Sequence, residues 1–168
     1  MSSTTSTSDT GMACVSFDVF GKVRGKGRPR FTRGGRPYTP KATRDYERAI
    51  REAFENANGR PPEPFSGPIA VCIMTYRQLP KSAPKSVIRE PDTHKPDADN
   101  VAKVVLDALN GVAWLDDAQV TSLTVVKLDR MREPERMSVS ITEHNCLGEE
   151  RNDLENREHE ADAKRRLR

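Results

Sequence analysis

Four aspartates and one lysine lie close together in the sequence, around one short helical pattern. Asp97 and Asp99 stand at the expected beginning of that helix, and Lys103 follows Asp99 by four residues. Asp116 and Asp117 come after its expected end, just before a strand pattern. Carboxylates brought together repel one another unless a cation lies between them, and the hard ion Mg²⁺ prefers oxygen ligands. The four aspartates are therefore candidate metal ligands.

The chemistry that these residue types favour is metal-assisted phosphodiester hydrolysis. A bound divalent cation lowers the pKa of a coordinated water and offsets negative charge on a phosphate. Lys103 lies one helical turn beyond Asp99 and would neutralise charge that develops on the phosphate in the transition state. The expected cofactor is Mg²⁺, with Mn²⁺ as a substitute, and no small-molecule cofactor is expected.

Each of these residues also has an ordinary structural explanation. Asp99 would serve as a helix N-cap, worth about 1 kcal/mol, and Asp97 would be favoured by the helix dipole, worth about 0.3 to 1 kcal/mol. Lys103 would be an ion-pair partner of Asp99, worth about 0.2 to 0.5 kcal/mol, and the two later aspartates would be turn residues. Asp107 shares a helix face with Lys103 and either holds its ammonium in place or makes a simple salt bridge. Spacing alone leaves these alternatives open.

A second feature is a basic segment that contains no acidic residue between Lys22 and Arg36. Its glycines and prolines exclude a regular helix and predict a loop or an irregular hairpin. Such a run of one charge is suited to contacting DNA phosphates, although a solubilising loop is the alternative. Phe31 and Tyr38 interleave with it and either stack on exposed bases or pack into the core. The candidate DNA-binding residues are Arg24, Lys26, Arg28, Arg30, Arg33 and Arg36.

Hydrophobic periodicity predicts the elements that must position these residues. Period-two alternation indicates strands, and apolar spacings of three and four indicate helices. The resulting order predicts an α+β domain in which two helices pack on one face of a small mixed sheet. The last two strands are expected to pair as a hairpin. Strands are predicted at 15–23, 69–76, 120–129 and 137–142, and helices at 40–58 and between Asp97 and Asn110.

The length of 168 residues favours one domain with loose ends. The net charge of only +3 says little by itself, because the charge is unevenly distributed along the chain. We expect a disordered polar leader at 1–13, a folded domain at 14–146 and a charged helical or disordered tail at 147–168. Three widely spaced cysteines without a C-x-x-C pair indicate neither a disulfide framework nor a zinc cluster, as is typical of the reducing cytoplasm. No apolar run approaches the roughly 20 residues of a membrane span, so a membrane partner is not expected.

One continuous segment resembles the signature of the RusA family of Holliday-junction resolvases, of the phage or prophage type. This segment is K-P-D-A-D-N-V-A-K-V-V-L-D-A-L-N-G-V-A-W-L-D-D-A-Q-V, from Lys95 to Val120. The basic stretch G-K-G-R-P-R-F-T-R-G-G-R-P-Y-T-P also resembles the start of many phage-type members. By this resemblance Asp97 and Asp99 correspond to the paired metal-binding aspartates, Lys103 to the catalytic lysine and Asp117 to the third aspartate. The residue types alone do not separate Asp116 from Asp117.

The resemblance implies a homodimeric crossover junction endodeoxyribonuclease that needs Mg²⁺ and acts in DNA recombination and repair. Such an enzyme binds a four-way junction and nicks opposing strands, leaving 5′-phosphate and 3′-hydroxyl ends. The polar leader and the charged tail depart from the shorter members. The alternatives are a metal-dependent nuclease for flaps or other branched DNA and a non-catalytic junction-binding protein, which Mg²⁺-dependent nicking of a substrate panel would separate.

Overall fold

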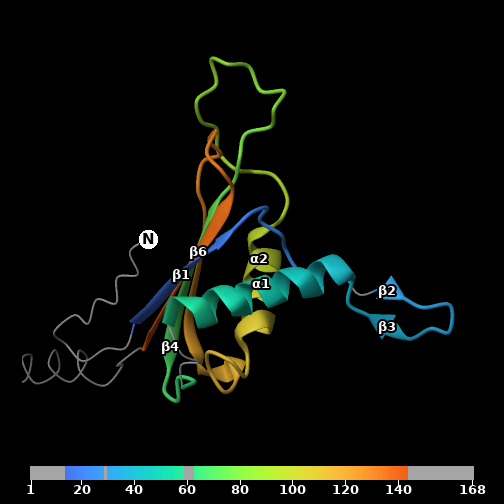
Figure 1. Cartoon of the computed structure of the whole chain (residues 1–168), viewed down its shortest axis with the longest axis vertical. Helices are drawn as coiled ribbons and strands as arrows, with labels where there is room; N and C mark the ends of the chain where they lie inside the picture. Colours follow the sequence, from blue (N-terminus) through green and yellow to red (C-terminus); the bar gives the residue numbers. More distant parts are fainter. Residues whose placement is uncertain (1–13, 29, 59–62, 144–168) are drawn as a thin grey trace, which may run out of the picture.

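The computed structural model describes residues 14–28, 30–58 and 63–143. The predicted leader and tail lie outside these ranges. The described chain has the predicted α+β architecture, a four-stranded mixed sheet with two long helices (Figure 1). Its elements are β1 (Cys14–Phe20), β2 (Arg30–Phe31), β3 (Pro37–Tyr38), α1 (Lys41–Asn58), β4 (Ile69–Tyr76), α2 (Ala98–Leu109), the short 3₁₀ helix η1 (Asp117–Gln119), β5 (Val120–Lys127) and β6 (Arg136–Glu143).

The strand order of the sheet is β1-β6-β4-β5. Strand β4 pairs in parallel with β5 and antiparallel with β6, and β6 pairs antiparallel with β1. The expected hairpin between the last two strands is therefore wrong, because β4 lies between β5 and β6. The strands of that pair were predicted correctly, but not their pairing partners.

The place of β4 follows from its composition. Its residues alternate between fully buried side chains toward the helices and half-buried ones on the other face. A strand that is apolar on both faces is most stable with a neighbour on each side. Helix α2 makes the crossover that places β5 parallel to β4, and the chain then crosses the end of β4 to start β6.

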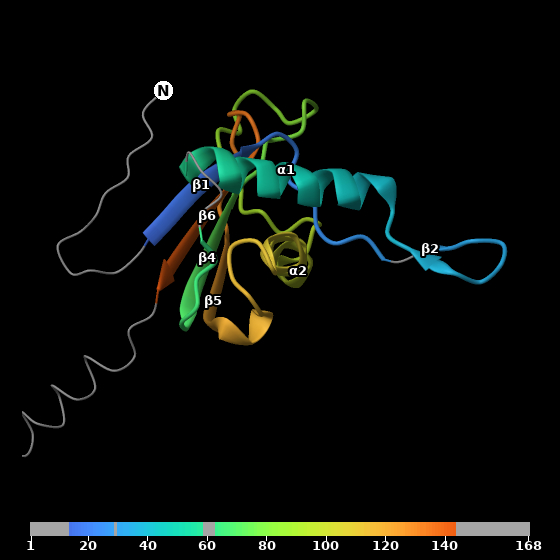
Figure 2. The same ribbon diagram turned by 60° about the horizontal axis from the view of Figure 1, so that its bottom comes forward.

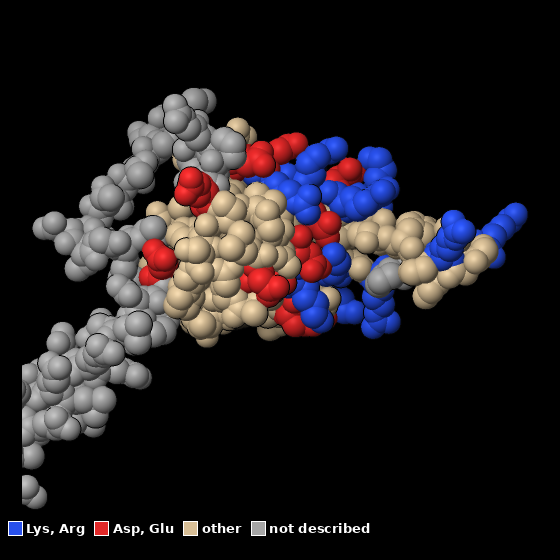
Figure 3. Space-filling view, turned by 90° about the horizontal axis from the view of Figure 1, so that it is seen from below, with Lys and Arg blue, Asp and Glu red and all other residues tan. Residues whose placement is uncertain are grey.

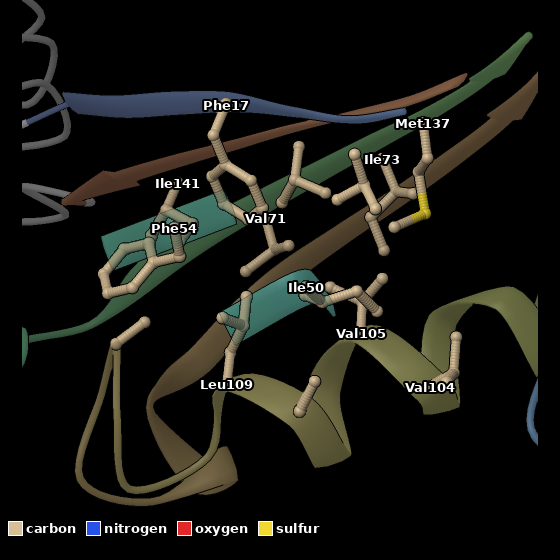
Figure 4. Close-up of a cluster of buried hydrophobic side chains, with 14 of the residues drawn as sticks. Phe17, Ile50, Phe54, Val71, Ile73, Val104, Val105, Leu109, Met137 and Ile141 are labelled. Atoms are coloured by element: carbon tan, nitrogen blue, oxygen red, sulfur yellow. The ribbon is translucent and has the colours of Figure 1, made fainter. Parts of the chain in front are cut away.

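Both helices cover the same face of the sheet, where the core lies (Figures 2 and 4). Phe17 of β1 packs edge-on against Phe54 of α1, with ring centroids 5.7 Å apart. Trp114, in the connection after α2, is fully buried. Together the apolar faces of α1 and α2 close over the buried residues of β4 and β6 and fix the position of α2 on the sheet.

The long connection between β4 and α2 projects beyond the sheet in Figure 1. The Arg132 guanidinium donates hydrogen bonds to the carbonyl oxygens of Pro84, at 2.8 Å, and Val87, at 3.3 Å. Glu90 forms an ion pair with Arg130. These bonds hold the connection against the segment between β5 and β6, so the start of α2 is delivered from a braced loop. In the described part of the chain, no helix has the length and apolar character needed to cross a membrane.

Strands β2 and β3 form a small hairpin that extends away from the body (Figure 2), and we call residues 30–38 the arm. The amide of Thr32 donates to the carbonyl of Arg36 at 2.9 Å, and the amide of Gly35 donates to the carbonyl of Thr32 at 3.0 Å. Gly35 has φ of 76°, which a residue with a side chain rarely adopts. The basic segment was predicted to be a loop or an irregular hairpin, and the hairpin is confirmed for residues 30–38.

Candidate active site

Helix α2 separates the acidic residues into two groups. Asp97 and Asp99 lie at its N-terminus, whereas Asp116 and Asp117 lie beyond its C-terminus. A helix of 12 residues is about 18 Å long. Within the described ranges, no group of three or more His, Cys, Asp or Glu side chains is placed to hold a metal ion. One chain thus presents the predicted metal ligands as two separate halves.

The first half, Asp97 and Asp99, is exposed, and only one of its two carboxylates makes an ion pair. Asp97 occupies the N-cap position of α2, but its side chain makes no capping hydrogen bond. Asp99 lies in the first turn, where its carboxylate is 3.5 Å from the Lys103 ammonium, and both side chains are more than 60% exposed. The capping explanation for Asp99 is therefore wrong, and the ion pair with Lys103 is present. Asp97 keeps its carboxylate oxygens available to a ligand.

The second half distinguishes its two neighbouring aspartates. Asp116 caps η1: its side chain accepts a hydrogen bond from the amide of Ala118 at 2.7 Å, and Gln119 completes a capping box. Asp117 is half-buried and accepts a hydrogen bond on Oδ1 from the indole nitrogen of Trp114 at 2.9 Å. The buried indole fixes the direction of the Asp117 carboxylate. Asp116 has a local structural role, and Asp117 is held as an oriented acid.

Lys26 has a different environment from the other basic residues of its segment. Its ammonium lies 2.7 Å from a Glu47 oxygen on α1 and 2.5 Å from an Asp107 oxygen on α2. Burial lowers the pKa of Lys26, but the hydrogen bonds to Asp107 and Glu47 outweigh this effect and the pKa is raised overall. Asp107 therefore makes a salt bridge with Lys26. The sequence had suggested Lys103 as the partner of Asp107. Lys26 ties the basic segment to both helices.

The basic segment runs directly past the first acidic half. The amide of Lys26 donates to the carbonyl of Asn100 at 2.8 Å. A Cβ at Gly25 would lie 2.9 Å from the Cβ atoms of both Pro96 and Asn100. Gly25 is thus required by the close approach of the backbone to the start of α2. The sequence signal for this contact was the G-K-G spacing, which by itself indicated only a loop.

The remaining predicted DNA-binding residues extend from this contact into the arm. Arg24, Arg28, Arg33 and Arg36 are exposed, while the Arg30 side chain lies outside the described part of the chain. Figure 3 shows Lys and Arg side chains gathered at the end of the molecule that carries the arm, and on the arm itself. Phe31 and Tyr38 are 69% and 44% exposed, so the core-packing alternative for them is wrong.

Sequence reasoning missed a buried carboxylate close to the site. The Asp92 side chain is fully buried and accepts hydrogen bonds from the Arg77 guanidinium at 3.0 and 3.3 Å. Lys127, the last residue of β5, lies 3.9 Å from the same carboxylate and donates to the carbonyl of His94. These contacts place the segment that leads into α2 beside the end of β5. Nothing in the local sequence distinguished Asp92 from an ordinary loop acid.

The chain is similar to known proteins over most of its length. Residues 21–142 match the protein family Endodeoxyribonuclease RusA. A similar protein of Bacillus subtilis (strain 168), the uncharacterized protein YqaN, is 34% identical over 145 residues. That similarity covers 79% of this chain and 98% of the relative. The family match spans both acidic halves and the whole basic segment from Lys22 to Arg36.

Proposed function

Because this chain belongs to the RusA family of endodeoxyribonucleases, we propose that it resolves four-way DNA junctions by Mg²⁺-dependent hydrolysis. We further propose that it acts as a homodimer whose two subunits together build each active site. The observation that supports this proposal is the position of the two acidic halves at opposite ends of α2. Neither half alone offers the three carboxylates that the predicted metal site requires.

A second subunit can unite the two halves without any change in the fold. In this arrangement Asp97 and Asp99 of one subunit and Asp117 of its partner would hold the cation. Two-fold symmetry then generates two equivalent sites. When bound, Mg²⁺ would lower the pKa of a water and offset charge on the phosphate.

The chain's own residues have separate parts in this proposal. Lys103 lies one turn above Asp99 and places a positive charge beside the scissile phosphate, where charge develops in the transition state. Trp114 orients the carboxylate of Asp117 through its indole N–H. The arm and the exposed arginines before it would contact the DNA backbone. A symmetric dimer with two arms and two sites matches a branched substrate that must be cut in two strands.

The proposal is tested by incubating the protein with a synthetic four-way junction, with and without Mg²⁺. We expect nicks in opposing strands only with the metal, and no nicks with the Asp97→Asn variant, which should still bind the junction. Flap, single-stranded and linear duplex substrates of matching sequence serve as the comparison. If the protein cleaves flaps in preference to junctions, its substrate is another branched DNA. If it binds the junction but shows no metal-dependent nicking, it is a non-catalytic junction-binding protein.

A further inference from the structure

We propose that residues 77–91, which we call the lobe, are a second DNA-binding limb of this protein. The lobe would contact one duplex branch of the substrate while the arm contacts another. This proposal rests on the proposed function in one respect, namely that the substrate is branched DNA. It assigns a ligand to a surface that lies outside both acidic halves and outside the basic segment.

The lobe presents positive charge with little opposing charge. Residues 78–89 include Lys81, Lys85 and Arg89 but no acidic residue, and all three side chains are exposed. Arg89 lies 3.7 Å from the carboxylate of Asp129. Within the described ranges of the chain, neither Lys81 nor Lys85 forms an ion pair. Ammonium groups that are exposed and not neutralised by the protein are suited to binding a polyanion such as the DNA backbone.

Two consecutive turns of similar sequence display these lysines. The turns are P-K-S-A at 80–83 and P-K-S-V at 84–87. The amide of Ala83 donates to the carbonyl of Pro80 at 2.9 Å, and the amide of Val87 donates to the carbonyl of Pro84 at 3.0 Å. Each turn therefore carries its lysine at the second position, where side chains commonly face solvent. The lobe thus repeats one exposed cation every four residues.

The lobe is braced at both ends and in its middle. The amide of Leu79 donates to the carbonyl of Met131 at 2.7 Å, and the amide of Glu90 donates to the carbonyl of Arg130 at 3.1 Å. The Arg132 guanidinium holds the middle through its bonds to two backbone carbonyls. The positions of the lysines are therefore set before a ligand binds, which reduces the ordering cost of binding.

The lobe and the basic segment meet at the first acidic half. From the lobe the chain passes the buried Asp92 and leads directly to Asp97 and Asp99. From the other side, the basic segment is held against the start of α2 by the bond from the Lys26 amide to the Asn100 carbonyl, at 2.8 Å. DNA that reaches the first acidic half therefore has both the lobe and the root of the arm beside it.

The two limbs project in different directions. In Figure 1 the lobe extends beyond the end of the sheet, whereas the arm extends to the side of the body. Duplex DNA resists sharp bending over short lengths, so one straight duplex that passes the first acidic half can follow only one limb. Branched DNA has two duplex axes that meet at the branch point. Such a substrate can occupy both limbs at once.

An acidic protein could also bind exposed lysines. DNA is favoured because the lobe adjoins the site where the proposed function brings a DNA phosphate, so the same polyanion already lies next to it. The lobe would therefore add affinity for branched DNA that linear DNA cannot use.

Salt-dependent binding without Mg²⁺ tests the charge of the lobe. We expect Lys81→Gln and Lys85→Gln each to reduce the salt dependence of junction binding by about 1 in slope, and to leave binding of a linear duplex unchanged. Replacing Arg33 and Arg36 in the arm should reduce the slope for both substrates. Arg48→Gln on α1 is the control and should change neither. Unchanged junction slopes in both lobe variants, or equal losses with the linear duplex, would overturn the proposal.

Tethered cleavage tests where the lobe lies on the DNA. The chelate Fe-EDTA is attached to a single cysteine, Ile88→Cys in the lobe or Gly34→Cys in the arm, with Cys14, Cys72 and Cys146 changed to serine. Ile88 is 78% exposed, so its replacement removes little packing. On a junction whose branches are labelled one at a time, we expect the two chelates to cut different branches. A chelate on the natural, exposed Cys14 is the control and should cut neither branch.

Cuts in the same branch from the lobe and the arm, or no cuts from the lobe, would overturn the proposal and leave the lobe to another partner. Both experiments measure binding without catalysis by the protein. A lobe that contacts a junction which the protein never nicks with Mg²⁺ would support the second limb and refute the proposed function. Mg²⁺-dependent nicking of junctions with no effect of the lobe variants would refute the second limb alone.

Discussion

Two adjacent aspartates, Asp116 and Asp117, have different surroundings in the folded chain. The Asp116 side chain caps η1 by accepting a hydrogen bond from the amide of Ala118. The Asp117 side chain accepts a hydrogen bond from the indole N–H of the buried Trp114. An aspartate and an asparagine are about equally good caps, and both accept a hydrogen bond from an indole. Replacing either residue by asparagine therefore removes charge while leaving its local contacts in place.

This pair of variants tests which acid serves the metal. We expect Asp117→Asn to lower the rate of junction cleavage by at least about 100-fold, since losing even an outer partner of a metal ligand costs about 10- to 100-fold. The Asp116→Asn variant should cleave the junction at a rate within a few-fold of that of the unaltered protein. The measurement is single-turnover nicking at saturating Mg²⁺. Equal losses in both variants would show that the two acids act together.

At the scale of elements, the position of the basic segment depends on Gly25. Its backbone approaches Pro96 and Asn100 so closely that a Cβ would force the two segments apart. Both opposing atoms are Cβ atoms, whose positions follow the backbone and cannot rotate away. The segment that carries the arginines and the helix that carries Asp97 and Asp99 are thus set against each other by one glycine.

We expect Gly25→Ala to lower the cleavage rate by about 10- to 100-fold, because a displacement of about 1 Å near reacting groups has effects of this size. Gly34→Ala is the matched control in the same segment, since a Cβ there would meet only the Thr32 hydroxyl oxygen at 3.9 Å. Cleavage and thermal unfolding are measured for both. If Gly25→Ala cuts normally at unchanged stability, the close approach has no bearing on catalysis.

The arm is the second element with a function of its own to test. Arg33 and Arg36 are exposed, and the backbone of the arm is held in an ordered turn. Replacing Arg33 and Arg36 together by glutamine should weaken binding to all DNA substrates and reduce the salt dependence of binding by about 1 in slope for each phosphate that is no longer bound. Arg48→Gln on α1, which removes a charge that is paired with Asp45, is the control. An unchanged salt slope would remove the arm from the DNA interface.

At the scale of the whole molecule, the separation of the acidic halves makes subunit mixing informative. Asp99→Asn and Asp117→Asn damage opposite halves, so each homodimer should be inactive. A heterodimer of the two variants contains one intact site. Random association makes half of the dimers heterodimeric, and we expect about one quarter of the unaltered activity to return.

Mixing Asp97→Asn with Asp99→Asn is the matched control, because both substitutions lie in the same half and every site in the mixture stays damaged. No activity should return in that mixture. Nicking of a labelled junction is compared before and after the subunits are allowed to exchange. A site built within one subunit would give no recovery in either mixture, which would exclude the shared site.

Much of the fold was predictable because it depends on local patterns. Alternating apolar residues indicated β4 with its observed bounds, Ile69–Tyr76, and helical spacing indicated α1 and α2. The pairing of β5 was not predictable from such patterns. A polar turn after a strand favours a hairpin locally, but the burial of β4 on both faces gave it β5 and β6 as its two neighbours.

The sequence by itself determined the family resemblance and the candidates for the chemistry, which are the aspartates around α2, Lys103 and the basic segment. Only the tertiary structure decided how they are arranged. It placed the two acidic halves at opposite ends of one rigid helix, assigned Asp116 to a cap, and paired Lys26 with Asp107 and Glu47. The reason is physical: spacing along the chain specifies neighbours within one or two turns of a helix, whereas distances between elements follow from how the whole sheet and its helices pack.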